Sequence, residues 1–500
     1  MAIRPILLLA LLAAAPAAAG QRDAPVTPRD LMRHVEVLAS DAFEGRAPGT
    51  DGERRTISYI AAELARRGVE PAGADGGWYQ PVALIRRRSG THRARWTANG
   101  RPLAFDDRRI TLIGSRAEQR VADAPVVFAG HGFVDDRRRI DQLAGADLAG
   151  AVVLLLVEPP HVASFPSYQD RVHAVAARGA AAVIGIVSDD LPWRMLAEAG
   201  ANNRVERDDG LPPVSGTIPA GEVARLVAEG GGDFAALLDE RAGPSFRAVP
   251  LNLRASFEVM SEVQLYGSNN VVGRIRGTAR GGGAGGESVL LLAHWDHLGL
   301  CRPEGEADRI CNGAVDNASG VATLIEAAGR LAARRPDRDV LILATTAEED
   351  GLLGAEHFAA HPAVPIGSIV AALNMDTVAI HGRGEPVAVV GRGIAPLDQA
   401  IADTAASLGR RLDDSHGADV FLRRQDGYAL ARVGVPAVMV GGSFANMELL
   451  QAFLSSRYHA PDDEPGPDLP LEGAAEDADL IVALARRLAD PALYQPPGGG

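Results

Sequence analysis

Val289-Leu290-Leu291-Leu292-Ala293 is an apolar run of strand length, and His294-Trp295-Asp296-His297 follows it directly. Three further runs of this kind lie along the chain, at 340–345, 369–374 and 436–440. A helical pattern comes after each of the four runs, at 320–334, 353–360, 396–409 and 471–488. Strands that alternate with helices indicate an α/β fold, a mostly parallel mixed sheet covered by helices on both faces. We expect this sheet to be the core of residues 251–492.

Residues 124–250 have a different pattern of predicted strands and helices from this core. Short β-branched runs bounded by turns occur at 125–130, 151–157 and 181–187, and a helical pattern lies at 170–179. This predicts a small, β-rich α/β module inserted in the main domain. Residues 20–123, which begin with two amphipathic helical patterns at 27–38 and 56–68, are expected to be the first part of the main domain.

A glycine-rich segment at 281–286 connects the apolar residues 270–277 to the run at 289–293. It lacks the following Lys-Ser/Thr and the helix start of a phosphate-binding loop. We therefore predict a hairpin loop there.

The first 19 residues have the layout of a secretory signal peptide. Arg4 precedes an apolar run at 6–15, and small residues follow at 17–19. The run is shorter than the roughly 20 residues of a membrane-spanning helix, and no cysteine stands near residue 19 to accept a lipid. We expect a cleaved signal peptide, a periplasmic or secreted protein and no membrane anchor. At the other end, residues 493–500 are expected to be a disordered tail.

Composition excludes several classes of function. The chain has 500 residues and a formal net charge of -14, which argues against a nucleic-acid-binding surface. Lysine is absent, so Schiff-base chemistry and the lysine of a phosphate loop are excluded.

The only two cysteines are Cys301 and Cys311. In an oxidising compartment, a pair this close in sequence favours one disulfide that closes a short loop. A zinc site and two buried free thiols are the alternatives.

Polar residues that can bind a metal stand at the ends of the predicted strands and near the C-terminus. They are His294 and Asp296, Asp316, Glu348 and Glu349, Asp376, and His459. Ligands of an open α/β sheet bind at the carboxyl ends of the strands, so these residues should meet in one crevice. Two histidines and several carboxylates suit zinc, and five ligands exceed what one tetrahedral ion with an open position can use. They can hold two ions about 3.5 to 4 Å apart if one carboxylate bridges.

Each motif alone has an ordinary structural explanation. Asp316 could be a helix cap, Glu348-Glu349 a solvated acidic loop and His459 a core or surface histidine. Only the order and placement of the motifs together favour a metal site.

This order resembles that of the co-catalytic dizinc exopeptidases, a family that includes secreted bacterial leucine-type aminopeptidases, glutamate carboxypeptidase II and the transferrin receptor ectodomain. The segments Glu44-Gly45-Arg46 and Gly313-Ala314-Val315-Asp316 also look like those of bacterial members. Residues 124–250 are similar to the protease-associated domain often inserted in this family. The resemblance implies a peptide substrate and two zinc ions.

The resemblance also implies a ligand set. His294 and Asp376 would bind one zinc ion, Glu349 and His459 the other, and Asp316 would bridge the two.

Other positions match residues with roles in catalysis. Glu348 corresponds to the general base, which takes a proton from a water between the metals and returns it to the leaving amine. Asp296 corresponds to the carboxylate that orients the first histidine, and Tyr458 to the phenol that stabilises the oxyanion. Asp426 and Asp463 align with recurrent acidic positions of the family.

The segment Asp316-Asn317-Ala318-Ser319 resembles the aminopeptidase branch, because the glutamate carboxypeptidase branch has a proline after the bridging aspartate. We therefore expect an aminopeptidase. A carboxypeptidase or dipeptidase of the same family and a non-catalytic, receptor-like binding protein are the alternatives. The sequence has no Gly-x-Ser-x-Gly or His-Glu-x-x-His motif, and His357 and His361 are interpreted as ordinary helix residues.

Overall fold

The four apolar runs form parallel strands that are buried on both faces. In β13 (Ser288–His294), Val289 and Leu291 pack into one core and Leu290 and Leu292 into another, because successive side chains of a strand point to opposite faces. The other three strands are β16 (Asp339–Thr345), β17 (Ile369–Asn374) and β19 (Ala437–Gly441), and the sheet order is β19–β17–β13–β16. The computed structural model describes residues 23–135, 139–158, 166–190, 193, 204–208, 210–240, 246–279 and 286–497.

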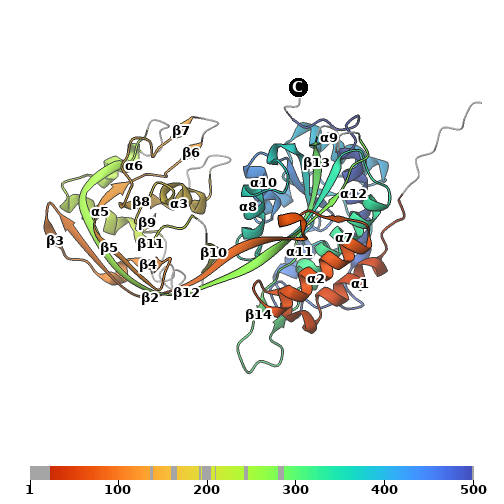
Figure 1. Ribbon diagram of the computed structural model, residues 1–500, viewed down its shortest axis with the longest axis horizontal. Coiled ribbons are helices and arrows are strands. Elements are labelled where there is room, and N and C mark those ends of the chain that lie inside the picture. The colour runs from red at the N-terminus through yellow and green to blue at the C-terminus, as the bar shows by residue number, and fades with distance from the viewer. Residues whose placement is uncertain are drawn as a thin grey trace, which may run out of the picture.

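Helices cover both faces of this sheet (Figure 1). On one face lie α1 (Pro28–Leu38), α2 (Asp51–Arg66), α7 (Ser319–Ala333), α9 (Ala395–Ser407) and α12 (Leu471–Leu488). On the other face lie α8 (Leu353–Ala360) and α10 (Gly427–Arg432), which contribute Phe358 and Leu430 to the second core. The predicted α/β fold is confirmed.

Two long antiparallel strands connect this main lobe to a smaller lobe (Figure 1). They are β2 (Tyr79–Ala98) and β12 (Val249–Ile275). At ~3.3 Å per residue, the 27 residues of β12 extend over about 90 Å. Ile275 lies in the core of the main lobe and Phe257 in the core of the smaller lobe, so one strand contributes to both.

The smaller lobe continues the sheet beyond β12. Its strands are, in sheet order, β5 (Glu118–Phe128), β8 (Val152–Leu156), β9 (Ala182–Val187), β11 (Val214–Pro219) and β4 (Thr111–Gly114). Its helices are α3 (Tyr168–Ala176), α5 (Ala220–Glu229) and α6 (Phe234–Glu240). Trp96 and Leu112 belong to its core, so this lobe also takes in residues that precede the predicted 124–250 module.

Short elements complete the described fold. They are β1 (Glu70–Pro71), β3 (Arg101–Leu103), β6 (Val134–Asp135), β7 (Ile140–Asp141), β10 (Arg204–Arg207), β14 (Gly299–Leu300), β15 (Ile310–Cys311), β18 (Ala388–Val390) and α11 (Met447–Leu454).

The predicted hairpin between 270–277 and 289–293 is wrong. β12 pairs antiparallel with β16, and β16 lies between β12 and β13. The reason is the crossover through α7, which places β16 beside β13 and separates the two strands that are adjacent in sequence.

The two ends of the chain were expected to lie outside the fold. The predicted signal peptide, residues 1–19, falls outside the described residues. The expected tail does not begin at 493, because Tyr494 is only 2% exposed and its carbonyl accepts a hydrogen bond from Arg338 at 3.0 Å. Within the described part of the chain, no helix has both the length and the apolar character needed to cross a bilayer.

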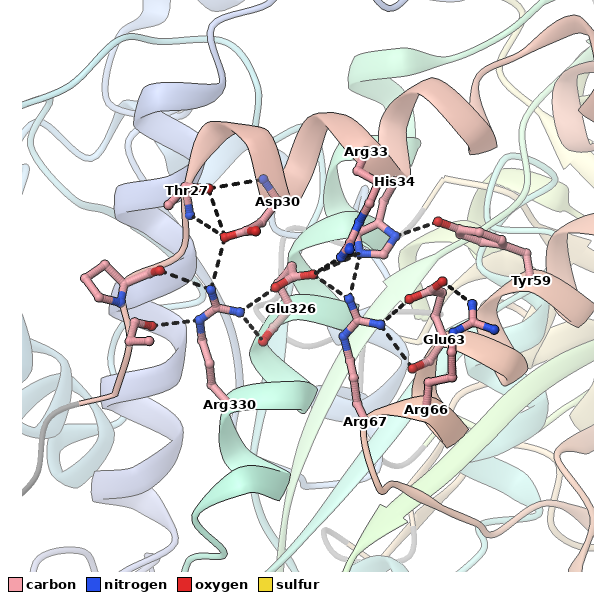
Figure 2. A network of polar contacts seen from close by, with 12 residues as sticks. Thr27, Asp30, Arg33, His34, Tyr59, Glu63, Arg66, Arg67, Glu326 and Arg330 are labelled. Carbon is pink, nitrogen blue, oxygen red and sulfur yellow. Dashed lines mark hydrogen bonds and ion pairs between the residues drawn. The ribbon is translucent and has the colours of Figure 1, made fainter.

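A polar network holds the first two helices against α7 (Figure 2). At its centre Glu326 of α7 accepts hydrogen bonds from Arg67 at 2.6 Å and Arg33 at 3.1 Å, and it lies 2.9 Å from His34. Despite its burial, the contacts with His34, Arg330 and Arg67 keep the pKa of Glu326 well below the ordinary value. The network fixes the helix that begins directly after the Asp316 segment.

Candidate metal centre

The carboxyl ends of β13, β16 and β17 lie at the same edge of the sheet, because the three strands are parallel. The five predicted metal ligands converge there: His294, Asp316, Glu349, Asp376 and His459. His294 is the last residue of β13, and the others come from loops.

Three of these residues form the first ligand group. His294 Nε2 lies 3.3 Å from Asp316 Oδ1 and 3.4 Å from Asp376 Oδ1. All three residues are buried, and their ligand atoms lie within 4.8 Å of one another. This group could hold one metal ion.

Asp316 also belongs to a second ligand group, with Glu349, His459 and His297. His459 Nε2 lies 2.9 Å from Glu349 Oε2 and 3.4 Å from Asp316 Oδ2. His297 Nδ1 lies 2.6 Å from Glu349 Oε1. The two carboxylate oxygens of Asp316 therefore face different groups, as a bridging ligand requires.

The electrostatics of the centre favour positive charge. Burial lowers the pKa of His294, but the surrounding carboxylates raise it well above the ordinary value. Burial likewise lowers the pKa of His459, while Asp316 and Glu349 raise it to about 9. The same imidazoles lower the pKa of Asp316 in spite of its burial. A carboxylate cluster of this kind suits a bound cation.

Asp296 connects the His294 loop to the loop of Glu348 and Glu349. Its carboxylate accepts hydrogen bonds from the main-chain N–H groups of Glu348 at 3.1 Å and Glu349 at 3.4 Å. His294 Nδ1 lies 3.2 Å from the Asp296 carbonyl oxygen and 3.8 Å from its carboxylate. The contact nearest to the His294 ring thus comes from the main chain, while the side chain fixes the glutamate loop.

Two further buried aspartates hold loops and belong to neither group. Asp463 accepts hydrogen bonds from the N–H groups of Val315 and Asp316, each at 3.1 Å, and burial raises its pKa to about 6. Asp426 accepts a hydrogen bond from Thr345, and burial raises its pKa to about 6 as well.

A pocket that is open to solvent lies beside the first ligand group. It is lined by Asp316, Glu348, Asp376, Thr377, Phe421, Arg424, Met439, Phe444, Leu450, Leu454 and Tyr458. Glu348 lines this pocket but belongs to neither ligand group. The Tyr458 ring stacks on His459 at 3.7 Å between centroids, and burial with nearby carboxylates raises its pKa, so the phenol stays a hydrogen-bond donor.

The cysteine pair lies near this centre. Cys301 and Cys311 form a disulfide that closes the segment from β14 to β15. The alternatives of a zinc site and of free thiols therefore do not apply. His357 and His361 stack on each other and belong to neither ligand group.

Two residues of the centre had no predicted role. His297 is the last residue of the His294-Trp295-Asp296-His297 motif, and its place in that motif was the available signal. Arg46 belongs to the Glu44-Gly45-Arg46 segment that resembles bacterial members of the family, and it is 1% exposed and donates to the Trp295 and Gly313 carbonyl groups.

The residues present fit zinc. Imidazole nitrogen and carboxylate oxygen are among its preferred ligand atoms. Within the described residues, the buried Nε2 atom of His459 makes no hydrogen bond, and carboxylate oxygens of Glu349 and Asp316 lie 2.9 and 3.4 Å from it. A nitrogen atom placed in this way among carboxylate oxygens can share a metal ion with them.

Part of the chain matches a known family. Residues 270–482 match the sequence profile of Peptidase family M28, in agreement with the resemblance of the motifs. Comparison with curated protein sequences gives no match.

Several solved structures are similar to this chain at low identity. An aminopeptidase from Aneurinibacillus sp. strain AM-1 is 19% identical, with a TM-score of 0.45 over 94% of this chain and 95% of that chain. A zinc aminopeptidase from Bacillus subtilis is 16% identical, with a TM-score of 0.46 over 95% and 98%. A Peptidase M28 precursor from Shewanella amazonensis is 17% identical, with a TM-score of 0.43 over 94% and 99%.

Proposed function

Because residues 270–482 belong to Peptidase family M28, we propose that the protein is a zinc-dependent exopeptidase, and specifically an aminopeptidase that removes N-terminal residues from peptides. The observation that carries the proposal is the pair of ligand groups that share Asp316. A general base candidate and an apolar pocket adjoin the first group. An acidic cluster with only a structural role would not require two ligand groups that share a residue, a candidate general base and a pocket.

Two zinc ions are proposed as the cofactor. His294 and Asp376 would hold one ion, Glu349 and His459 the other, and Asp316 both. Bound zinc would polarise the scissile carbonyl and make a water molecule more acidic. His297, whose Nδ1 lies 2.6 Å from Glu349, is proposed to orient that ligand.

Glu348 and Tyr458 are proposed as the residues that act on the substrate. Glu348 would accept the proton of the attacking water and return it to the leaving amine, as a carboxylate outside both ligand groups can. Tyr458 would donate a hydrogen bond to the carbonyl oxygen as negative charge develops there. Asp296 would hold Glu348 in place through its main-chain N–H group.

The pocket supports action at the amino end of a peptide. A free N-terminal amine is positively charged, and the carboxylates of Asp316, Glu348 and Asp376 line the pocket. The remaining wall is mostly apolar and includes Met439 and Phe444. We propose that this wall receives an apolar N-terminal side chain.

One observation favours a carboxypeptidase as the second candidate. Arg424 also lines the pocket, and a substrate carboxylate would pair with its guanidinium group. The guanidinium carbon of Arg424 lies 6.0 Å from the centroid of the Phe421 ring, which also lines the pocket.

One experiment separates these candidates. The zinc-loaded protein is incubated with three forms of one peptide: unblocked, blocked at the amino end and blocked at the carboxyl end. Release of the first residue that stops only when the amino end is blocked supports the aminopeptidase. Release of the last residue overturns it in favour of the carboxypeptidase, and zinc binding without release of any residue favours a receptor-like protein.

Export and the role of the smaller lobe are also proposed. The disulfide between Cys301 and Cys311 supports an oxidising, periplasmic or secreted location. N-terminal sequencing of the exported protein should find its start at or near residue 20. Residues 124–250 are proposed to be a protease-associated domain that contacts the main lobe, since Arg432 of α10 pairs with Asp170 of α3.

A further inference from the structure

Arg46 is a buried cation whose hydrogen bonds end on main-chain carbonyl groups. It is 1% exposed. Its guanidinium group donates to the carbonyl oxygens of Leu38 at 2.8 Å, Trp295 at 2.9 Å, Asn312 at 2.6 Å and Gly313 at 2.9 Å. A single side chain therefore joins three segments that are far apart in the sequence.

Two of these segments carry metal-ligand candidates. Trp295 follows His294 directly, and Gly313 stands three residues before Asp316. The guanidinium group thus connects the His294 loop to the Asp316 loop, which together supply two of the three members of the first ligand group. A change at Arg46 would remove a contact from both loops at once.

The Asp316 loop is held from its other side by Asp463. Arg46 binds the carbonyl groups of Asn312 and Gly313, while the main-chain oxygen of Asp463 accepts the N–H group of Ala314 at 2.9 Å. The carboxylate of Asp463 takes the next two N–H groups. Arg46 supplies the donors of this arrangement and Asp463 the acceptors.

The positive charge of Arg46 also acts on the carboxylates of the centre. Burial lowers its pKa, while Asp316, Asp463 and Asp296 oppose this change, and the resulting value of about 10 keeps the group charged at neutral pH. Carboxylates must be deprotonated to bind zinc, and they repel one another when they are. A permanent positive charge beside them reduces that repulsion.

The preceding glycine makes this position possible. Gly45 has a φ of +62°, and a Cβ atom there would come within 2.5 Å of the Cys311 carbonyl oxygen and 2.8 Å of the Gly299 Cα. Only a residue without a side chain lets the Arg46 segment lie so close to the disulfide-closed segment.

We propose that Arg46 is a positioning residue of the metal centre, which fixes the His294 and Asp316 loops through their carbonyl groups and offsets the charge of the carboxylates. This inference rests on the proposed function, because it assumes that the two loops hold zinc.

The test compares Arg46→Lys and Arg46→Met with the same substitutions at Arg171. Arg171 is 2% exposed and donates to the carbonyl groups of Ser167, His131, Leu156 and Val157 in the smaller lobe. It therefore matches Arg46 in burial and in the kind of bond, away from the centre. The readouts are zinc affinity by competition with a chromophoric chelator, Tm of the metal-free protein, and kcat and KM.

Arg46→Lys keeps the charge but loses the planar fork of donors. We expect its zinc affinity to fall by about 10- to 100-fold, the usual effect of a lost partner of a metal ligand, and kcat to fall more than KM changes. Arg46→Met should bind zinc more weakly still. The Arg171 variants should lower Tm without changing zinc affinity.

The proposal would be overturned if Arg46→Lys and Arg171→Lys lowered Tm equally while the zinc affinity of Arg46→Lys stayed unchanged. This test remains possible with Arg46→Lys even if Arg46→Met does not fold. Failure of the proposed function is a separate result. If the wild-type protein binds zinc but cleaves no peptide, the aminopeptidase is refuted, and the zinc affinities still decide the role of Arg46.

Discussion

Replacing Glu348 by glutamine changes the proposed proton carrier and little else. The substitution keeps the shape of the side chain but removes its ability to accept a proton. Glu348 belongs to neither ligand group, so both should keep their members. The bond from its main-chain N–H group to Asp296, at 3.1 Å, does not depend on the side chain, so the loop should keep its place.

The size of the effect follows from the two proton transfers assigned to Glu348. General acid–base catalysis contributes about 10²- to 10⁴-fold, or about 3 to 5 kcal/mol of barrier. Since the same carboxylate serves both the attacking water and the leaving amine, we expect a loss of kcat near the upper end of this range, and KM should change little.

The assay is steady-state hydrolysis of an unblocked peptide, with zinc content measured on the same samples. Asp350→Asn is the matched control, because Asp350 is a carboxylate of the same loop that neither lines the pocket nor joins a ligand group. Its kcat should stay near that of the wild type. Full activity of Glu348→Gln would refute the assignment of the base, and loss of zinc from this variant would show that Glu348 is a ligand instead.

Three further outcomes are expected. Tyr458→Phe should retain zinc and lower kcat by about 10²-fold, the lower end of the effect of losing an oxyanion donor, and an unchanged kcat would remove its role. Met439→Trp should fill the pocket and lower kcat/KM for peptides that begin with Phe by about tenfold or more relative to Ala, whereas an unchanged ratio would place the N-terminal side chain elsewhere. Glu326→Gln should destabilise the protein by about 2 to 3 kcal/mol at neutral pH, less than the loss of a fully buried pair because Arg33 is largely exposed. The pKa of Glu326 is lower in the folded state than in the unfolded state, where it is about 4.3. The stability difference between the wild type and Glu326→Gln should therefore be complete above a pH of about 4.3 and shrink as the pH falls below it. Thermal unfolding of both proteins at several pH values would check this.

The sequence was sufficient to predict the main sheet and where the ligand candidates would gather. Each core strand is buried on both faces, so it appears as an unbroken apolar run, and the end of the run is marked by the first polar residue, as at His294. Parallel strands then bring these ends to one edge, and no long-range information is needed.

The long strands β2 and β12 were harder to predict because their buried positions include charges. Arg87 of β2 is fully buried and donates to Glu206 of β10 at 2.9 Å. The run Arg86-Arg87-Arg88 therefore looks like exposed chain, although its middle residue packs inside the smaller lobe. A buried ion pair hides the alternating pattern by which strands are recognised.

The wrong hairpin prediction and the missing role of Arg46 share a cause. Whether β12 pairs with β13 or with β16 depends on where the crossover through α7 places β16, which local sequence does not determine. Arg46 has acceptors in three separate segments, and only the folded chain brings them together.

The zinc content of the saturated and desalted protein tests the paired centre most directly. Because Asp316 faces both ligand groups, we predict two zinc ions per chain. A saturated protein that retains one zinc ion, or none, would contradict the account.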